Sequence, residues 1–191
     1  MYIIAKRWVD VFLAFWACIL LAPAAAVLAA LIWLDSPGPV IFRQRRVGAH
    51  RRHFDILKFR TMQLDTPKDV PTHLLGDPTV YVTRMGRFLR RTSLDELPQL
   101  INILKGDMSI VGPRPALWNQ QDLLAIRQRL GVNDIRPGLT GLAQIKGRDE
   151  LPIRTKARYD AIYLRHMGLV LDIAIVVKTA GRVFTGEGIR Q

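Results

Sequence analysis

The sequence predicts a helix-dominated α+β protein that begins with a membrane helix. Three observations support this fold class. A continuous uncharged segment extends from Val11 to Leu34. Two short segments, 40–42 and 54–62, carry the apolar and the alternating patterns that are typical of strands. Much of the second half of the chain has apolar residues three to four positions apart, which indicates amphipathic helices.

The uncharged segment is long enough to cross a bilayer. Its 24 residues would extend about 36 Å as a straight helix. Three interpretations are open: a helix that crosses the membrane, a cleaved signal peptide, and a helix that enters one leaflet and returns. Residues 24–26, all alanine, offer a small-residue cleavage site. Apolar residues continue as far as Leu34, however, which argues against cleavage at that site.

Basic flanks and one proline favour the re-entrant interpretation. Cations lie on both sides of the segment, at Lys6, Arg7, Arg43, Arg45, Arg46, Arg51 and Arg52. Because Lys and Arg are enriched in cytoplasmic flanks, both ends are expected in the cytoplasm. Pro23, which follows Ala22, has no N–H and is expected to break or kink the helix near its middle. We therefore expect a re-entrant membrane helix in residues 1–35 and a compact cytoplasmic domain in residues 36–191.

Candidate strands open the cytoplasmic domain. Residues 40–42 are predicted to form a short strand, the arginine-rich residues 43–52 a loop or hairpin, and residues 54–62 a half-buried strand. Lys58 and Arg60 lie on one face of that strand, since side chains alternate along a strand. They could reach a phosphate or form an ordinary surface pair.

Two adjacent carboxylates, Asp95 and Glu96, follow a run of cations. The cations are Arg84, Arg87, Arg90 and Arg91. Arginines attract phosphate, and a divalent cation can bridge a carboxylate and a phosphate, so the arrangement suits an anionic, metal-bound substrate. The alternative is a capping box, in which Ser93 and Glu96 begin a helix. Pro98 fits best in a first helical turn, so the helix could begin beside it and leave both carboxylates at its mouth.

The remaining segments are mostly helical and are separated by stiff turns. We expect helices in residues 97–105, 118–130, 153–167 and 169–184, and a strand in residues 142–145. Residues 63–81 are expected to form a loop that could act as a lid. Pro113 and Pro115 fix the backbone on either side of Arg114, which suits either a bidentate phosphate contact or a rigid exposed turn. The apolar residues 169–184 could pack on the first helix or lie at the membrane interface.

The composition limits the partners and the kind of site. The net charge of +12 and the pI of about 10.7 require an anionic partner: nucleic acid, anionic membrane lipids or a phosphate-rich substrate. Nucleic-acid binding is disfavoured because the sequence has no RNP-like, zinc-finger or helix-turn-helix pattern. A non-catalytic membrane anchor is a further alternative. A single cysteine, Cys18, and four scattered histidines provide neither a disulfide framework nor a convincing metal cluster.

Five segments match one known family in the family's order. They are residues 39–44 (PVIFRQ), 58–62 (KFRTM), 89–99 (LRRTSLDELPQ), 105–115 (KGDMSIVGPRP) and 136–141 (RPGLTG). Any one of these segments would be a weak signal, but together they extend over nearly the whole chain and are highly specific. The chain resembles the bacterial sugar transferases, and among them the short form of the monotopic phosphoglycosyl transferases.

The resemblance implies an activity. Enzymes of this family transfer a sugar 1-phosphate from a nucleotide sugar, usually a UDP-sugar, to undecaprenyl phosphate on the cytoplasmic face of the bacterial inner membrane. UMP leaves, and the product primes exopolysaccharide, capsule, O-antigen or glycoprotein glycan assembly. The family uses Mg²⁺ and a covalent intermediate. The sequence leaves open which sugar is used, which glycan is built and whether the protein is a homodimer.

The resemblance also implies roles for individual residues. Asp95 would be the nucleophile and a metal ligand, and Glu96 would assist, for example by handling a proton. Substrate phosphate would be bound at the following positions: Arg90, Arg114, Pro113, Pro115, Lys58 and Arg60. Two positions depart from the family. Ala22 replaces a serine at the helix break, which bears on the bend, and Leu142 replaces a tryptophan, which bears on substrate specificity.

Overall fold

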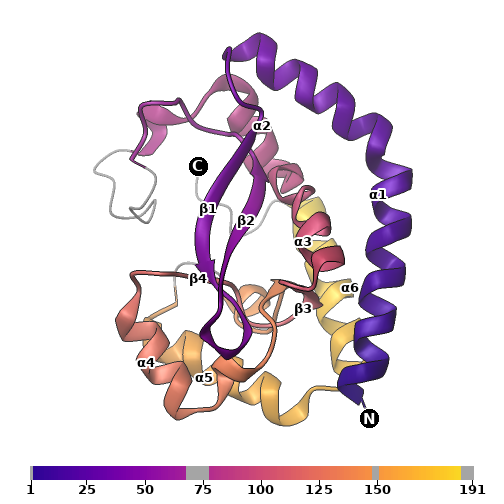
Figure 1. Cartoon of the computed structure of the whole chain (residues 1–191), viewed down its shortest axis with the longest axis vertical. Coiled ribbons are helices and arrows are strands. Elements are labelled where there is room, and N and C mark those ends of the chain that lie inside the picture. The colour runs from indigo at the N-terminus through magenta and orange to yellow at the C-terminus, as the bar shows by residue number, and fades with distance from the viewer. Residues whose placement is uncertain (1, 68–77, 148–150, 186–191) are drawn as a thin grey trace.

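The computed structural model describes residues 2–67, 78–147 and 151–185. One long N-terminal helix, α1 (Tyr2–Asp35), stands beside a set of shorter helices and two small sheets (Figure 1). The predicted helix-dominated α+β class is therefore confirmed. Helix α1 ends at the residue where the sequence predicted the end of the membrane element.

Helix α1 is continuous, with Pro23 inside it. Figure 1 shows that the helix is bent and that its C-terminal part leans over the rest of the molecule. A bend is expected near Pro23 because its nitrogen cannot donate a hydrogen bond to the carbonyl of Ile19. Of the two outcomes expected at Ala22 and Pro23, a break or a kink, the break is therefore excluded, because the helix is not interrupted there. The re-entrant path through a membrane stays a prediction.

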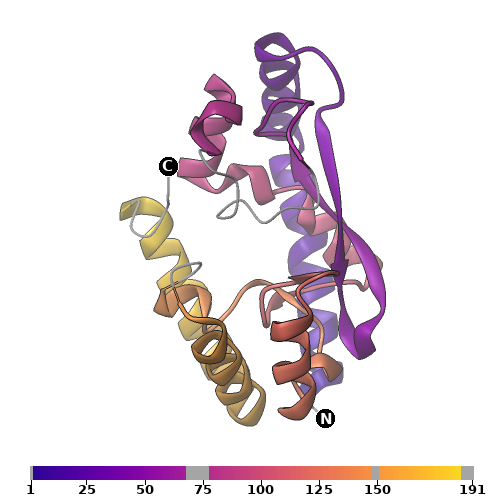
Figure 2. The same ribbon diagram turned by 90° about the vertical axis from the view of Figure 1, so that its left-hand side faces the viewer.

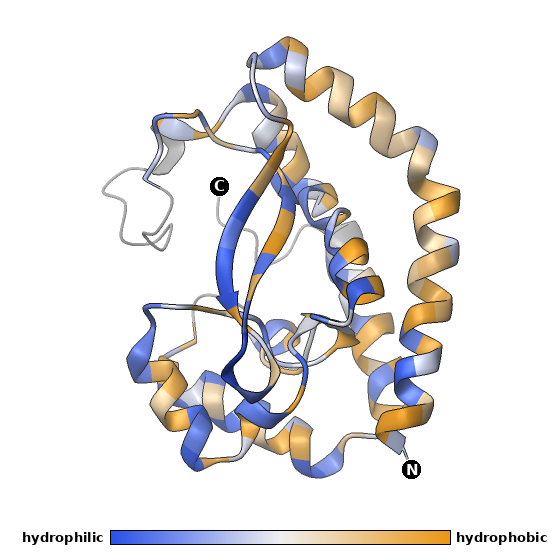
Figure 3. Ribbon diagram, viewed as in Figure 1, coloured by the Kyte–Doolittle hydropathy of each residue, from blue (hydrophilic) through white to orange (hydrophobic). Residues whose placement is uncertain are grey.

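The surface of α1 is hydrophobic along most of its length (Figure 3). Its exposed large apolar side chains include Trp8, Phe12, Phe15, Trp16, Leu20, Val27, Trp33 and Leu34. Among the described residues, α1 is the one helix that is long and apolar enough to cross a membrane. Exposed apolar surface costs about 25 cal/mol per Å² in water, so a surface of this extent suits contact with lipid.

A long hairpin follows α1. Strands β1 (Ile41–Val47) and β2 (His53–Phe59) pair antiparallel over their whole length, and the turn η1 (Ala49–Arg51) closes the hairpin. The short strand β4 (Ala116–Leu117) pairs with the other edge of β1. Of the two structures left open for residues 43–52, the hairpin is therefore the one that forms.

The segment that carries the two carboxylates follows the hairpin. It consists of η3 (Pro78–Tyr81), α2 (Arg84–Thr92), η4 (Leu94–Glu96) and α3 (Gln99–Lys105). Helix α3 ends at Lys105, as predicted for the helix at residues 97–105, and Gly106 follows it with a left-handed φ of 96°. Most of the predicted loop at residues 63–81 lies outside the described residues.

The C-terminal half combines a two-stranded parallel sheet with three helices. Its elements are β3 (Ser109–Val111), α4 (Gln121–Arg129), η5 (Val132–Asp134), β5 (Gly138–Thr140), η6 (Gln144–Lys146), α5 (Ile153–His166) and α6 (Leu169–Thr185). Strand β3 pairs with β5. Figure 2 shows α5 and α6 on the opposite side of the molecule from the β1–β2 hairpin.

The strand predicted at residues 142–145 is wrong. The strand of this region is β5, which begins at Gly138, inside the RPGLTG motif of residues 136–141. A Cβ atom at Gly138 would lie 2.1 Å from the backbone nitrogen of Gly112. Only glycine allows β5 to come this close to the end of β3, and a glycine within a strand marks such an approach. Residues 144–146 form a helical turn instead.

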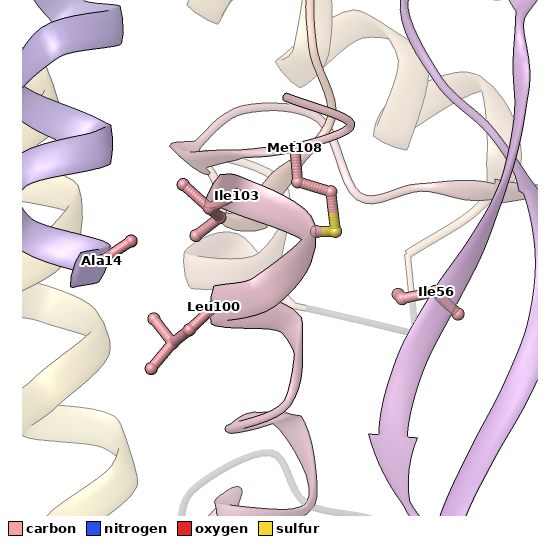
Figure 4. Packing of buried hydrophobic residues seen from close by; sticks show 5 residues of the cluster. All are labelled: Ala14, Ile56, Leu100, Ile103 and Met108. Atoms are coloured by element: carbon pink, nitrogen blue, oxygen red, sulfur yellow. The ribbon is translucent and has the colours of Figure 1, made fainter. Parts of the chain in front are cut away.

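Helix α3 lies between α1 and the hairpin and joins them (Figure 4). One core cluster spans the three elements and contains Ala14, Ile56, Leu100, Ile103 and Met108. Arg7 of α1 adds a polar contact, because its Nη1 and Nη2 atoms donate to the carbonyls of Ile103 and Leu104 at 2.6 and 3.1 Å. These carbonyls belong to the last turn of α3, and that of Ile103 also accepts from the N–H of Gly106 at 3.1 Å. Helix α3 is therefore attached to α1 by apolar packing and by hydrogen bonds.

Helix α6 contacts the beginning of α1. Asp172 accepts hydrogen bonds from the Tyr2 hydroxyl at 2.8 Å and from Lys6 Nζ at 2.6 Å. Other residues of α6 leave apolar side chains exposed, namely Leu169, Val170, Ile173, Val176 and Val177. Helix α6 therefore meets α1 through these polar contacts, while its buried Ile175 packs against Val111, Ile145 and Tyr163. The exposed apolar residues are compatible with the membrane interface.

Candidate active site

The two adjacent carboxylates lie in the turn η4, between α2 and α3. The capping-box prediction is wrong, because Ser93 has a left-handed φ of 58° and its side chain makes no capping hydrogen bond. A capping residue needs an extended backbone to aim its hydroxyl at the first turn. The Ser93 N–H instead donates to the carbonyls of Leu89 and Arg90 and ends α2. Asp95 and Glu96 are therefore available to contact other elements.

Lys58 contacts both carboxylates from strand β2. Its Nζ atom lies 2.7 Å from Oε1 of Glu96 and 3.6 Å from Oδ2 of Asp95. The register of the hairpin places Lys58 opposite Phe42, so its side chain shares a face with Phe42 and with Ile56. Ile56 packs in the core beside α3. The hairpin thus delivers one cation to the carboxylate pair.

Arg114 is a second cation at the pair. Its Nη1 atom lies 3.5 Å from Oε1 of Glu96, and 42% of its side chain is exposed. Pro113 and Pro115 on either side are buried. Arg114 thus lies between two buried prolines, contacts Glu96 and is partly exposed, and its contact with a substrate phosphate stays a prediction.

Arg90, on the last turn of α2, is the third cation. Its Nε atom donates to the hydroxyl of Thr61 at 3.0 Å. The positive charge of Arg90 acts to lower the pKa of Asp95. Thr61 follows β2 and lies close to α2, because a Cβ atom at Gly86 would be 2.0 Å from the carbonyl oxygen of Thr61. The end of the hairpin therefore fixes where Arg90 points.

Burial dominates the electrostatics of Asp95. It raises the pKa of this carboxyl above the ordinary value for aspartate, and the charge of Glu96 acts in the same direction. The cations Lys58, Arg90 and Arg114 oppose the shift. Removing a carboxylate from water disfavours its charged form, whereas neighbouring cations favour it. Asp95 accepts no hydrogen bond from any other described residue, so its oxygens are poorly solvated and remain available to react.

The structure does not bring Arg60 to this cluster. Arg60 is buried, and its guanidinium donates to the carbonyls of Ser36 and Pro37 in the turn after α1. The strand ends at Phe59, so the alternation that placed Lys58 and Arg60 on one face stops between them. Arg60 fixes the exit of α1 in this structure, and its suggested part in phosphate binding gains no support from these contacts.

Sequence reasoning missed Thr61 and a buried ion pair behind Arg114. Thr61 lies inside the 58–62 motif, in which only the cations Lys58 and Arg60 indicated a function. The ion pair joins Arg127 of α4 to Asp160 of α5, with Nη2 and Oδ2 2.7 Å apart. The available signal was an aspartate on the apolar face of the predicted helix 153–167. Asp160 lies on the face that also buries Ala157, Ala161 and Tyr163.

The carboxylate pair is the candidate position for a divalent cation. Among the described residues there is no group of three or more His, Cys, Asp and Glu side chains that could hold a metal alone. Mg²⁺ usually binds through one or two carboxylates together with substrate phosphates. Asp95 and Glu96 provide such a donor set, and the unshared oxygens of Asp95 fit a hard cation.

A cavity of about 500 Å³ lies elsewhere, beside the N-terminal end of α2. Its lining includes Asp35, Ser36, Thr83, Arg84 and Arg87. The carboxylate pair lies beyond the opposite end of α2. Asp35 there accepts a hydrogen bond from the backbone of Met85 at 2.8 Å and so caps the helix. This cavity is therefore separate from the candidate active site.

Comparison with known proteins agrees with the geometry. The family model described as bacterial sugar transferase matches residues 1–186. The chain is 41% identical to the UDP-glucose:undecaprenyl-phosphate glucose-1-phosphate transferase of Xanthomonas campestris pv. campestris, over 95% of this chain and 39% of that protein. It is 39% identical to the UDP-N-acetylgalactosamine-undecaprenyl-phosphate N-acetylgalactosaminephosphotransferase of Aeromonas hydrophila, over 99% of this chain and 46% of that protein.

A shorter relative matches over its full length. The chain is 38% identical to the exopolysaccharide production protein PSS of Rhizobium leguminosarum bv. phaseoli, over 98% of this chain and 100% of that protein. It thus spans less than half of the two relatives with a stated reaction and all of the third. The family match covers nearly the whole described chain, including the hairpin, the η4 turn and the Arg114 turn. This chain belongs to the bacterial sugar transferase family.

Proposed function

We propose that the protein transfers a sugar 1-phosphate from a UDP-sugar to undecaprenyl phosphate and releases UMP. The observation that carries this proposal is Asp95, a half-buried carboxylate that accepts no hydrogen bond from another described residue and lies among Lys58, Arg90 and Arg114. A carboxylate in this environment is a competent nucleophile toward phosphorus. The named reactions of the Xanthomonas and Aeromonas relatives agree with it.

The first step forms a covalent intermediate. An oxygen of Asp95 attacks the phosphorus that carries the sugar, the bond from that phosphorus to the bridging oxygen of UMP breaks, and UMP leaves with the bonding electrons. The intermediate is an aspartyl-phosphosugar. Lys58, Arg90 and Arg114 neutralise the negative charge that builds on the non-bridging oxygens during this displacement.

The second step returns the enzyme to its starting state. A phosphate oxygen of undecaprenyl phosphate attacks the same phosphorus, and the bond to Asp95 breaks, which restores the carboxylate. Glu96 is the candidate for accepting a proton from the lipid phosphate. Lys58 and Arg114, at 2.7 and 3.5 Å from Glu96, hold its carboxylate in place for this role. Both substrates are anionic, which also accounts for part of the net charge of +12.

Asp95 is the proposed magnesium ligand, and Glu96 is close enough to assist. A bound Mg²⁺ would add Lewis-acid stabilisation to the charge on the phosphates. Chelation with EDTA should then abolish UMP release, and added Mg²⁺ should restore it. Full UMP release after chelation would remove magnesium from the proposal and leave the role of Asp95 intact.

We further propose that α1 enters the cytoplasmic leaflet of the bacterial inner membrane and returns, so that the protein is monotopic. The exposed apolar surface of α1 and the cations on both sides of it support this path. Single cysteines introduced near Met1 and near Gly48 in a Cys18→Ser background should both react with a reagent supplied from the cytoplasmic side. Labelling of the two cysteines from opposite sides would show a crossing helix instead.

A direct assay tests the reaction. The full chain is reconstituted with undecaprenyl phosphate and Mg²⁺, and UMP release is measured for UDP-glucose, UDP-galactose and UDP-N-acetylgalactosamine. We expect one of these sugars to support turnover. Without the lipid acceptor, a UDP-sugar labelled in its β-phosphate should leave the label on the peptide that contains Asp95. Stoichiometric labelling of another residue would transfer the nucleophile to that residue.

A further inference from the structure

We propose that Arg127 and Asp160 form a positioning pair that fixes the direction of the Arg114 side chain. This inference rests on the proposed function, because it assigns Arg114 to the substrate phosphates. Neither residue of the pair reaches the carboxylates itself. Their contribution is transmitted through the backbone of Arg114.

The contacts form one continuous path. Arg127 donates from Nε and from Nη2 to the same oxygen of Asp160, at 2.9 and 2.7 Å. The remaining nitrogen of its guanidinium, Nη1, donates to the backbone carbonyl of Arg114 at 2.9 Å. Arg127 is 5% exposed and Asp160 is 1% exposed. Asp160 therefore orients the planar guanidinium of Arg127, and the Nη1 atom of that group donates to the backbone of Arg114.

Three successive carbonyls of this turn are each held by a different element. The carbonyl of Pro113 accepts from the N–H of Gly138 in β5 at 2.9 Å, and that of Pro115 accepts from Nη1 of Arg46 in β1 at 3.0 Å. The carbonyl of Arg114, between them, depends on Arg127 of α4. The prolines restrict φ at two of the three positions. The Arg114 side chain thus starts from a fixed backbone and needs little ordering to reach Glu96.

The energetics favour a positioning role over a purely stabilising one. Removing two charges from water costs several kcal/mol per ion, so a buried ion pair is often no more stable than an apolar pair of similar size. A lysine at position 127 could contact Asp160 but could not present three donors in one plane. Burial raises the pKa of Asp160, and Arg127 opposes that shift. The arrangement requires arginine, because its planar guanidinium can donate to a carbonyl and to a carboxylate at the same time.

A double-mutant cycle tests the proposal. The pair is replaced as a unit by Arg127→Met with Asp160→Leu, so that no buried charge is left alone. We expect kcat/KM for the UDP-sugar to fall about tenfold in an otherwise normal chain. In an Arg114→Ala background the same replacement should have almost no further effect, because the side chain that it positions is absent. A fall of the same size in both backgrounds would overturn the proposal.

A nearby variant controls for general loosening of α4. Asn133→Ala removes the buried hydrogen bonds from Nδ2 to the carbonyl of Leu124 and to Oε1 of Gln128, at 3.0 and 3.2 Å. It disturbs the same helix without touching Arg114. At equal loss of unfolding temperature, Asn133→Ala should change kcat/KM less than twofold. If it lowers kcat/KM as much as the paired replacement does, the effect belongs to helix stability and positioning is refuted.

A second readout needs no turnover. Hydrogen exchange of the peptide that contains Arg114 should become faster in the Arg127→Met, Asp160→Leu chain and stay unchanged in Asn133→Ala. Unchanged exchange in both variants would refute the positioning pair even if the enzyme is active. If the unmodified chain releases no UMP from any UDP-sugar, the proposed function fails, and the exchange result alone decides whether the pair orders this turn.

Discussion

The molecule contains two clusters built around a pair of aspartate or glutamate side chains, and they differ in how completely the carboxylates are bonded. In the cluster at the start of α1, Asp10 and Asp172 accept hydrogen bonds at all four carboxylate oxygens. The donors are Tyr2, Lys6, Ser109, the N–H of Ile110 and Tyr163. In the cluster at η4, Glu96 accepts hydrogen bonds, whereas Asp95 accepts none from another described residue and contacts Lys58 only at 3.6 Å. Fully bonded carboxylates hold elements together, whereas a half-buried carboxylate without hydrogen bonds has the environment expected of a reactive group.

The charge balance of the two clusters differs in the same sense. Lys6 is the cation that pairs with Asp10 and Asp172, and neutral hydroxyl groups supply most of the other donors. Around Asp95 and Glu96 there are three cations, Lys58, Arg90 and Arg114. An excess of cations beside a reactive carboxylate is what a diphosphate substrate requires. The two clusters therefore differ as a structural site and the proposed catalytic site would be expected to differ.

The largest expected effect is that of Asp95→Asn. An amide cannot form the acyl phosphate, so UMP release should fall by at least about 1,000-fold, as when a catalytic nucleophile is removed. Because burial raises the pKa of Asp95, its charged form is disfavoured in the fold, and the neutral amide should leave the unfolding temperature unchanged or slightly higher. Initial rates and thermal unfolding are measured on the same preparation.

The matched comparison for Asp95→Asn is a conservative substitution of the neighbouring residue, Glu96. Glu96→Gln keeps the nucleophile, so it should slow the lipid-dependent step more than the release of UMP in a single turnover. If Glu96→Gln lost as much single-turnover UMP release as Asp95→Asn, the two carboxylates would not have separate roles. That result would contradict the assignment of Glu96 to the lipid-dependent step.

The second largest effect is expected in the saturated cluster. Asp172→Asn removes the charged acceptor of Lys6 and weakens the hydrogen bonds from Tyr2 and Tyr163. Breaking one side of a buried ion pair costs about 3 kcal/mol or more. We expect a loss of that size in the free energy of unfolding, measured with urea in a fixed detergent.

An exposed aspartate is the control for this loss. The Asp134 side chain is 61% exposed and has one ion-pair contact, to His50 at 3.8 Å. Asp134→Asn should change the free energy of unfolding by less than about 0.5 kcal/mol. Similar losses in the two variants would mean that the cluster at α1 is not a structural anchor.

Local patterns in the sequence predicted much of the fold. The uncharged run predicted α1, alternation predicted β2, and apolar spacing predicted a helix that ends at residue 105, where α3 ends. The β3–β5 pair could not be predicted, because residues 109 and 138 meet only in the folded chain. Strand β5 is three residues long and begins with glycine, so its own sequence carries the pattern of a turn.

The candidate site divides in the same way. Asp95, Glu96, Lys58, Arg90 and Arg114 come from motifs that were legible in the sequence, and the structure brings them together. The motifs did not indicate that Arg60 turns toward the end of α1 or that Thr61 orients an arginine. Those roles depend on which element lies opposite each side chain, and a strand pattern specifies a face without specifying what that face meets.

A smaller effect is expected for Lys58→Met, and it depends on pH. In the proposed mechanism the ionised form of Asp95 is the nucleophile, so activity should fall as pH drops through its raised pKa. Lys58 opposes that rise, so its removal raises the pKa of Asp95 further and moves the acid limb of the rate profile to higher pH. At neutral pH we expect a loss of about 30-fold in kcat/KM, since one of three phosphate cations is gone.

The pH profile separates this effect from simple misfolding. Lys58→Arg restores a cation at the same position, so it should return the acid limb toward that of the unmodified enzyme. If the acid limb of the rate profile had the same pH in Lys58→Met as in the unmodified enzyme, Lys58 would have no effect on the pKa of Asp95. That result would weaken the distinction between the two clusters.

The smallest expected effect is that of Thr61→Val. Valine keeps the size of threonine but cannot accept the hydrogen bond from Arg90 Nε, so the guanidinium loses one constraint on its direction. We expect kcat/KM to fall about fivefold, which corresponds to about 1 kcal/mol, the usual contribution of one hydrogen bond. The control is Thr92→Val on the same helix, whose hydroxyl bonds the carbonyls of Phe88 and Leu89 and touches no cation of the site. Equal losses in the two variants would mean that Arg90 finds its direction without Thr61, and that the end of the hairpin supports the catalytic cluster only through Lys58.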